Sequence, residues 1–269
     1  MLSLYMAKRD SGSGKIGLIR LEGAILDSRE TLEQLDKHQN NEAIKALVVR
    51  INSPGGGVAA AQEIYEEFDK IRSQRKKPVI VSMGSLAASG GYYVACASDR
   101  IFANPGSITG SIGVIMQLAN VSGLLDKVGI RSVTIKSGEH KDMGSMTKEI
   151  SPEDRKIFQE VLDDAHDQFI EAVVRGRKMD KGKVREIADG RIFTGRQALG
   201  LGLVDELGDL SDAIAYAARV TGIRGRPKIV EEKKRKFLLG MAGSRVLSFL
   251  TAQTSDPIAQ PLSIYYLMR

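Results

Sequence analysis

Short apolar runs alternate with segments of helical periodicity along the first hundred residues. The runs at 46–51 and 79–81 are continuous in hydrophobicity and rich in β-branched residues, which is typical of strands buried on both faces of a parallel sheet. Between them, residues 58–75 carry apolar side chains at helical spacing. This order predicts an α/β fold whose parallel strands are joined by right-handed helical crossovers.

The remaining elements follow from the same pattern and from helix start signals. We expect further strands at 16–21, 100–103, 109–117 and 132–136, and helices at 31–40, 92–97, 121–128, 151–175, 181–188, 195–200 and 210–218. The helix at 151–175 has the clearest start, because Ser151 stands at the cap position and Pro152 at the first helical position.

Composition changes twice along the chain and indicates three parts. Residues 1–14 end in a Ser-Gly repeat and are expected to form a flexible leader. Residues 15–222 hold all the expected elements and predict a single domain. Residues 223–269 are first basic, then apolar and then polar, and we interpret them as an appended tail rather than a second domain.

The composition is that of a globular protein, with 42% hydrophobic and 27% charged residues. No apolar run reaches the roughly 18 residues that a membrane-spanning helix needs. One cysteine and three histidines argue against a disulfide and a structural zinc site, so no metal or cofactor is expected. The net charge is +6 and part of the excess lies in the tail. Because no nucleic-acid motif accompanies it, we expect a solvated or membrane-facing patch rather than nucleic-acid binding.

A turn of small residues between the strand at 79–81 and the helix at 92–97 holds the first candidate for chemistry, Ser89. A serine at the start of a helix lies beside unpaired backbone N–H groups, which suits a nucleophile whose attack creates an oxyanion. The N–H of Gly90 is one candidate donor, and the glycine loop 55–57 after the neighbouring strand offers a second. The alternative is that these small residues only let the helix pack tightly against the sheet.

The base for such a nucleophile is harder to assign from residue types. His140, Lys141 and Asp142 share one loop after an expected strand. A Ser-His-Asp triad through His140 and Asp142 is possible, and so is a Ser-Lys dyad through Lys141. A lysine base must be neutral, which requires burial that lowers a pKa of ordinarily ~10.4.

Four collinear motifs carry a resemblance to a known family. They are INSPGGGV (51–58), MGSLAASGGYY (83–93), TGSIGV (109–114) and IKSGEHKD (135–142), followed by DGRIFTGRQALGLGLVDELG (189–208). In these segments the chain resembles signal peptide peptidase A of the S49 serine peptidases, over about residues 16–222. The resemblance implies a crotonase/Clp-protease-like fold, a repeated β-β-α superhelix, with 15–222 as the catalytic domain.

The resemblance also implies roles for individual residues. Ser89 matches the nucleophile and Lys141 the general base, while Ser111 matches the serine that orients the lysine amine. Gly56 and Gly90 match the oxyanion donors. His140 then has no assigned role.

Partners and location are likewise implied by the family. Its substrates are hydrophobic peptides such as signal-peptide remnants, cleaved at the cytoplasmic membrane by a catalytic domain on its extracytoplasmic side. Its short members form rings, so we expect a homo-oligomer of about eight subunits whose dyad lies at or near a subunit interface. Membrane-anchored members carry a spanning helix before this domain, and no such helix is visible in this sequence.

Two other functions and one regulatory role for the tail compete with this interpretation. The same fold could instead polarise an acyl-CoA thioester, although no acid adjoins Ser89 to act as the base. The chain could also be a non-catalytic scaffold that binds membranes or partners through its basic tail. Finally, the tail, which is apolar at 237–241 and 246–250, could fold over the active site as an internal substrate or plug.

Overall fold

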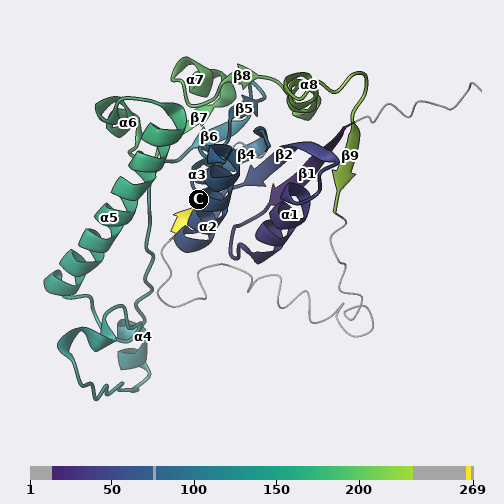
Figure 1. The fold of residues 1–269 in the computed structure, drawn as a ribbon. Helices are drawn as coiled ribbons and strands as arrows, with labels where there is room; N and C mark the ends of the chain where they lie inside the picture. Colours follow the sequence, from purple (N-terminus) through teal and green to yellow (C-terminus); the bar gives the residue numbers. More distant parts are fainter. Residues whose placement is uncertain (1–13, 75–76, 233–264, 268–269) are drawn as a thin grey trace, which may run out of the picture.

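An eight-stranded, mostly parallel sheet forms the centre of the protein (Figure 1). The computed structural model describes residues 14–74, 77–232 and 265–267. The strands of this sheet are β1 (Lys15–Glu22), β2 (Ile44–Ser53), β4 (Val79–Ala88), β5 (Arg100–Ala103), β6 (Ile108–Gly110), β7 (Ile192–Thr194), β8 (Glu206–Leu207) and β9 (Lys228–Glu231). Their order is β7-β6-β4-β2-β1-β9, and β5 pairs with β4 and β8. All these pairings are parallel except that of β6 with β7, which confirms the predicted α/β class.

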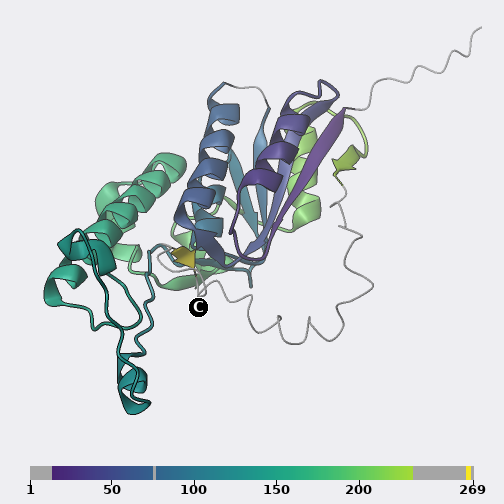
Figure 2. The same cartoon turned by 90° about the horizontal axis from the view of Figure 1, so that it is seen from below.

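Helices cover both faces of the sheet (Figures 1 and 2). They are α1 (Arg29–Gln39), α2 (Val58–Ser73), α3 (Gly90–Ala95), α4 (Ser122–Lys127), α5 (Pro152–Arg177), α6 (Lys181–Ile187), α7 (Gly195–Gly200) and α8 (Leu210–Val220), with a 3₁₀ turn, η1, at Glu139–Asp142. Alternate residues of β2 serve the two faces, as the strand period requires. Leu47 and Val49 belong to the core that includes α1, α2, α3 and α5, whereas Val48 packs with α8.

Strand β4 positions the site, because it has two neighbours in succession. Its first part pairs with β5, and its last three residues, Leu86 to Ala88, pair with β6. The ends of β4 and β6 therefore lie side by side. A second, two-stranded sheet consists of β3 (Gly55–Gly57) and β10 (Tyr265–Leu267), which run antiparallel.

Residues 116–150, which we call the arm, differ from the sequence prediction. The expected strand at 132–136 is absent, and of the expected strand at 109–117 only the start lies in β6. The arm leaves the sheet and projects beyond the lower end of α5, with α4 at its tip (Figures 1 and 2). An apolar segment such as 132–136 needs a hydrogen-bonded neighbour to form a strand, and within the described chain the arm offers it none.

The long helix α5 follows its sequence signals closely. Its cap, Ser151, accepts a hydrogen bond from the Asp154 amide at 3.0 Å, and Pro152 is the first helical residue. The helix ends at Lys178, which adopts a left-handed conformation with φ 53°. No helix in the described part of the chain is long and apolar enough to cross a membrane.

The three-part division of the chain stays a prediction, with one addition from the structure. Strand β9 lies beyond the expected boundary at residue 222, yet it pairs with β1 in the main sheet. The leader at 1–13 and the apolar tail segments 237–241 and 246–250 lie outside the described residues.

Candidate active site

Ser89 stands on a strained turn between β4 and α3. Its backbone has φ 54° and ψ −121°, a region that side-chain-bearing residues rarely adopt. The residue is only 1% exposed, and its Oγ has no hydrogen-bond partner in the described structure. A buried hydroxyl without a partner is costly, and a positive φ at a strand-to-helix turn is how some hydrolases present a nucleophile. The local geometry therefore fits a reactive serine.

Ser111 lies next to Ser89 because β4 and β6 end together. Ala88 pairs with Gly110, and the Ser89 amide donates to the Gly110 carbonyl oxygen at 2.8 Å. Ser111 also has a positive φ, 51°, and its amide donates to the Arg191 carbonyl oxygen at 2.8 Å. The structure thus brings together two of the residues singled out from the sequence.

The N–H of Gly56 points away from Ile25, the residue that its two neighbours in β3 contact. The flanking groups, the Gly55 carbonyl and the Gly57 amide, both bond to the backbone of Ile25 at 2.8 Å. In a strand the N–H and C=O of one residue point to the same edge, and successive residues alternate between the two edges. The Gly56 N–H and C=O therefore face the edge opposite to Ile25. A Cβ on Gly56 would lie 2.2 Å from the Ile25 carbonyl oxygen, so the position requires glycine.

Gly90 follows Ser89 directly and opens α3, where the first N–H groups have no partner within the helix. The end of β2 approaches the same helix closely, because a Cβ on Gly91 would lie 3.1 Å from the Ser53 carbonyl oxygen. The two glycine segments predicted as oxyanion donors therefore lie close together in the fold.

The edge of β3 that faces away from Ile25 is occupied by the chain's own tail. Tyr266 of β10 pairs with Gly56, and Leu267 pairs with Gly55, in an antiparallel register. Figure 1 shows β10 beside α2 and α3. An extended segment thus adds a strand at one of the predicted oxyanion glycines, which is how many proteins bind peptides.

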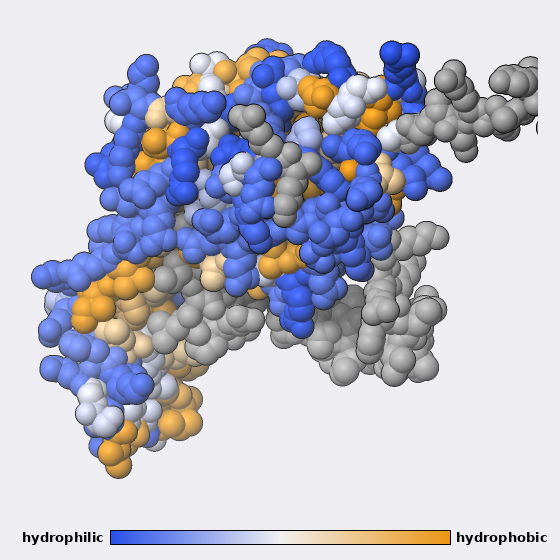
Figure 3. All heavy atoms as spheres, viewed as in Figure 1, coloured by the Kyte–Doolittle hydropathy of each residue, from blue (hydrophilic) through white to orange (hydrophobic). Residues whose placement is uncertain are grey.

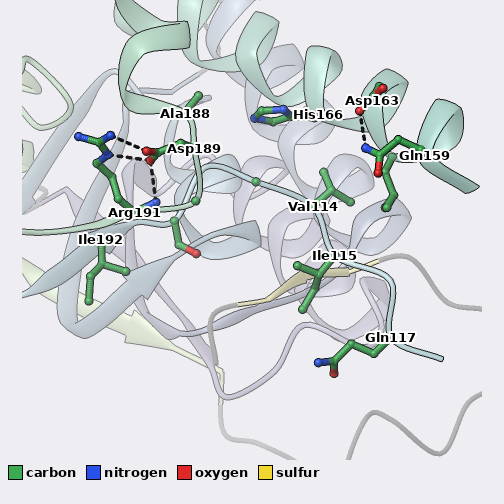
Figure 4. Close-up of a pocket in the computed structure, with 14 residues that line it drawn as sticks. Val114, Ile115, Gln117, Gln159, Asp163, His166, Ala188, Asp189, Arg191 and Ile192 are labelled. Atoms are coloured by element: carbon green, nitrogen blue, oxygen red, sulfur yellow. Dashed lines mark hydrogen bonds and ion pairs between the residues drawn. The ribbon is translucent and has the colours of Figure 1, made fainter. Parts of the chain in front are cut away.

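Ser111 also lines a cavity of about 960 Å³, part of whose lining is labelled in Figure 4. It lies between the residues that follow Ser111 and one face of α5, and apolar side chains such as Val114, Ile115 and Leu162 line it. Near Ala188, the Arg191 side chain pairs with Asp189 and lowers the pKa of that carboxyl to about 2. Val114 and Ile115 line this cavity, whereas the nearby Ile112 is buried in the core.

Lys141 lies in η1, which belongs to the arm, and it is exposed to solvent. The structure does not bring it to Ser89 within this chain, since the Ser89 Oγ is without a partner and the arm projects away from the sheet (Figure 2). The triad through His140 and Asp142 does not form either. His140 Nδ1 faces Asp154 at 3.3 Å, and Asp142 accepts from Lys136 at 2.7 Å.

Asp154 is a residue that the sequence reasoning missed. It is 3% exposed, and its carboxylate contacts His140, the residue before Lys141, and Lys148. The only sequence signal was its place in the first turn of α5, three residues after the capping serine, where an acid is ordinarily explained by helix capping. Nothing in the sequence linked it to His140.

Family models decide what class of protein this geometry belongs to. The model of peptidase family S49 matches residues 71–224, and that of Clp protease matches residues 19–109. The chain belongs to peptidase family S49. It is a serine peptidase with a Clp-protease-like α/β fold, and the acyl-CoA and scaffold alternatives are set aside.

Individual relatives agree with this assignment. The chain is 42% identical over 213 residues to an Enterococcus faecium protein named as the signal peptide peptidase SppA, covering 74% of this chain and 62% of that one. It is 37% identical to Protease 4 of Salmonella typhi over 80% of this chain, but this covers 36% of that protein. A Synechocystis sp. protein named as the protease slr0021 is 45% identical, over 78% of this chain and 75% of the relative.

Proposed function

We propose that this S49 peptidase cleaves peptide bonds with a Ser-Lys dyad, in which Ser89 is the nucleophile and Lys141 of a second copy is the base. The observation that carries the proposal is the buried, unpartnered Oγ of Ser89 on its positive-φ turn. A hydroxyl held in this way lacks only a group to remove its proton. No group in the described chain forms a hydrogen bond with it, so a neighbouring copy is the natural source of a base.

The proposed reaction follows from these positions. The neutral Lys141 amine takes the Ser89 hydroxyl proton as Oγ attacks the peptide carbonyl carbon. The N–H groups of Gly56 and Gly90 stabilise the oxyanion, and Ser111 orients the amine. The ammonium then protonates the leaving amine as the C–N bond breaks. Water, deprotonated by the same lysine, hydrolyses the acyl-enzyme and releases Ser89.

Assembly into a ring would supply the missing lysine. The arm exposes large apolar side chains, most of all Val133 at 83% and Ile135 at 97%, and apolar surface is visible over this region in Figure 3. Exposure of this kind is typical of a subunit interface. We propose a homo-oligomer, expected to be a ring of about eight, in which each arm packs on a neighbour and brings Lys141 to its Ser89.

Hydrophobic peptides are the proposed substrates. The edge of β3 receives an extended segment, as β10 shows by its register with Gly55 to Gly57. The cavity that Ser111 lines also contains apolar side chains, among them Val114, Ile115 and Leu162. The E. faecium relative is named for signal peptides. We therefore propose signal-peptide remnants as the substrates, and the cytoplasmic membrane as the place of action, with the catalytic domain on its extracytoplasmic side.

Complementation between two inactive variants tests the proposal. Wild type should cleave a hydrophobic fluorogenic peptide, and Ser89→Ala and Lys141→Ala should each lose at least ~10³-fold of kcat/KM. Dissociating and reassembling the two variants together should restore activity, up to roughly a quarter of the sites by random mixing. Peptide cleavage by Ser89→Ala would show that Ser89 is not the nucleophile. An inactive mixture of assembled variants would show that Ser89 and Lys141 of the same copy work together.

A further inference from the structure

Both residues that flank Lys141 are held by side-chain contacts. On one side, His140 Nδ1 lies 3.3 Å from Asp154 Oδ1. On the other, Asp142 Oδ1 accepts from the Lys136 and Lys148 amines at 2.7 and 3.2 Å. The side chain of Lys141 itself has no hydrogen bond or ion pair with the described residues. The turn is therefore fixed at two points and leaves one side chain free between them.

Asp154 connects these contacts to the body of the protein. Its side chain is 5% exposed, and its second oxygen receives Lys148 at 3.3 Å. It stands in the first turn of α5, whose later residues Phe169 and Val173 are fully buried in the main core. A rigid helix thus relates the position of the Lys141 turn to the position of the sheet.

The 3₁₀ geometry of η1 sets the directions of its side chains relative to one another. Successive residues of a 3₁₀ helix point about 120° apart, so His140 and Asp142 cannot face their partners while Lys141 faces the same way. While its neighbours contact Asp154 and Lys148, Lys141 stays exposed. An exposed side chain is accessible to another copy.

We propose that His140 and Asp154 are positioning residues, which hold the turn Glu139–Asp142 on α5 so that Lys141 meets the active site of a neighbouring copy. This proposal rests on the function proposed above. It gives His140 a role that neither the sequence nor the family resemblance assigned.

An ordinary surface ion pair is the competing explanation, and exposed pairs are worth little. The burial of Asp154 argues against it, since this carboxylate is shielded from water and shared between His140 and Lys148. A second acid, Glu153, lies 3.9 Å from His140, and its side chain is 68% exposed. This contact is an ordinary surface ion pair, so a substitution of Glu153 serves as the control for the contact with Asp154.

Two replacements of His140 separate these explanations. The amide nitrogen of asparagine can take the place of Nδ1, whereas that of glutamine takes the place of Nε2. His140→Asn should keep the contact with Asp154, and His140→Gln should lose it. We expect His140→Gln to lower kcat roughly ten- to a hundred-fold with KM unchanged, and His140→Asn and Glu153→Gln to stay within about twofold of wild type.

A second readout does not depend on catalysis. The Lys141 amide bonds to the Gly138 carbonyl oxygen at 3.2 Å, so hydrogen exchange over residues 138–143 reports whether the turn is held. Exchange there should accelerate in His140→Gln and not in His140→Asn, even if the wild type cleaves no peptide. Equal exchange and equal kcat in the two variants would overturn the proposal, as would a loss of kcat in Glu153→Gln as large as that in His140→Gln.

Discussion

The amide of Ser89 donates a hydrogen bond of 2.8 Å to the carbonyl oxygen of Gly110, and this bond joins the ends of two parallel strands. It fixes Ser89 beside Ser111, and both serines have positive φ angles. Such a conformation costs a side-chain-bearing residue about 1–2 kcal/mol and persists only where its surroundings impose it. The strain is therefore concentrated at the residues proposed to carry out the reaction.

Glycine at position 89 should relieve this strain. Ser89→Gly should be more stable than Ser89→Ala by about 1 kcal/mol, because glycine tolerates φ 54° without a Cβ clash. Both variants lack the hydroxyl and should be inactive, so stability can be compared without catalysis. Urea unfolding of the two proteins measures the difference. The reverse order of stability would mean that the turn is not strained.

Adjacent glycines in β3 should respond very differently to an added methyl group. Gly56→Ala places a Cβ 2.2 Å from the Ile25 carbonyl oxygen, whereas at Gly57 the nearest atom is 3.7 Å away. Gly56→Ala should therefore lose at least ~10²-fold of kcat/KM by displacing the proposed oxyanion donor, and Gly57→Ala should be nearly neutral. Steady-state kinetics and thermal unfolding of the pair check this. Equal effects at both positions would contradict the assignment.

Removal of β10 should open the substrate edge. The tail pairs with Gly56 in the register described above and would compete with any peptide that binds there. Deleting residues 265–269 should lower the apparent KM for a peptide substrate several-fold and leave kcat unchanged, as expected for a tethered competitor. Tyr266→Pro removes a backbone N–H from the ladder and should act in the same direction, whereas Tyr266→Phe keeps the backbone intact.

Binding of a labelled peptide with the sequence of residues 262–269 gives a second measurement. It should bind the truncated Ser89→Ala protein more tightly than the full-length Ser89→Ala protein. An unchanged KM together with equal peptide binding would rule out competition by the tail.

Acid should lower the stability of the folded protein by protonating Asp189, which pairs with Arg191 at the edge of the cavity. Hydrogen bonds from Arg191 lower the pKa of Asp189 to about 2. Because the folded-state pKa is depressed, the stabilisation is present above the ordinary value of about 4 and is lost as the pH falls toward 2. Asp189→Asn and Arg191→Gln should each flatten the decline of the unfolding midpoint between pH 4 and 2. The effect should be small, because the pair is half exposed. An unaltered decline in both variants would contradict it.

The sequence by itself determined the α/β class, the main strands and helices around the candidate nucleophile, and the position of that serine. Strands such as β2 and β4 are marked by continuous apolar runs, and α5 by its capping serine and proline, so these signals are local. Ser89 was visible for the same reason, since a small-residue turn between a strand and a helix lies within ten residues. The family resemblance added the choice of Lys141 as the base, because residue chemistry alone did not favour Lys141 over His140.

Only the tertiary structure decided which distant residues meet. The pairing of β4 with β6 places Ser111 beside Ser89, and the contact of Asp154 with His140 depends on how the arm returns to α5. Register and loop return are set by packing among elements far apart in the chain, which no short window contains. The same reason explains the strand wrongly predicted at 132–136: its apolar pattern is real, but a strand forms only where a neighbouring backbone is present to pair with it.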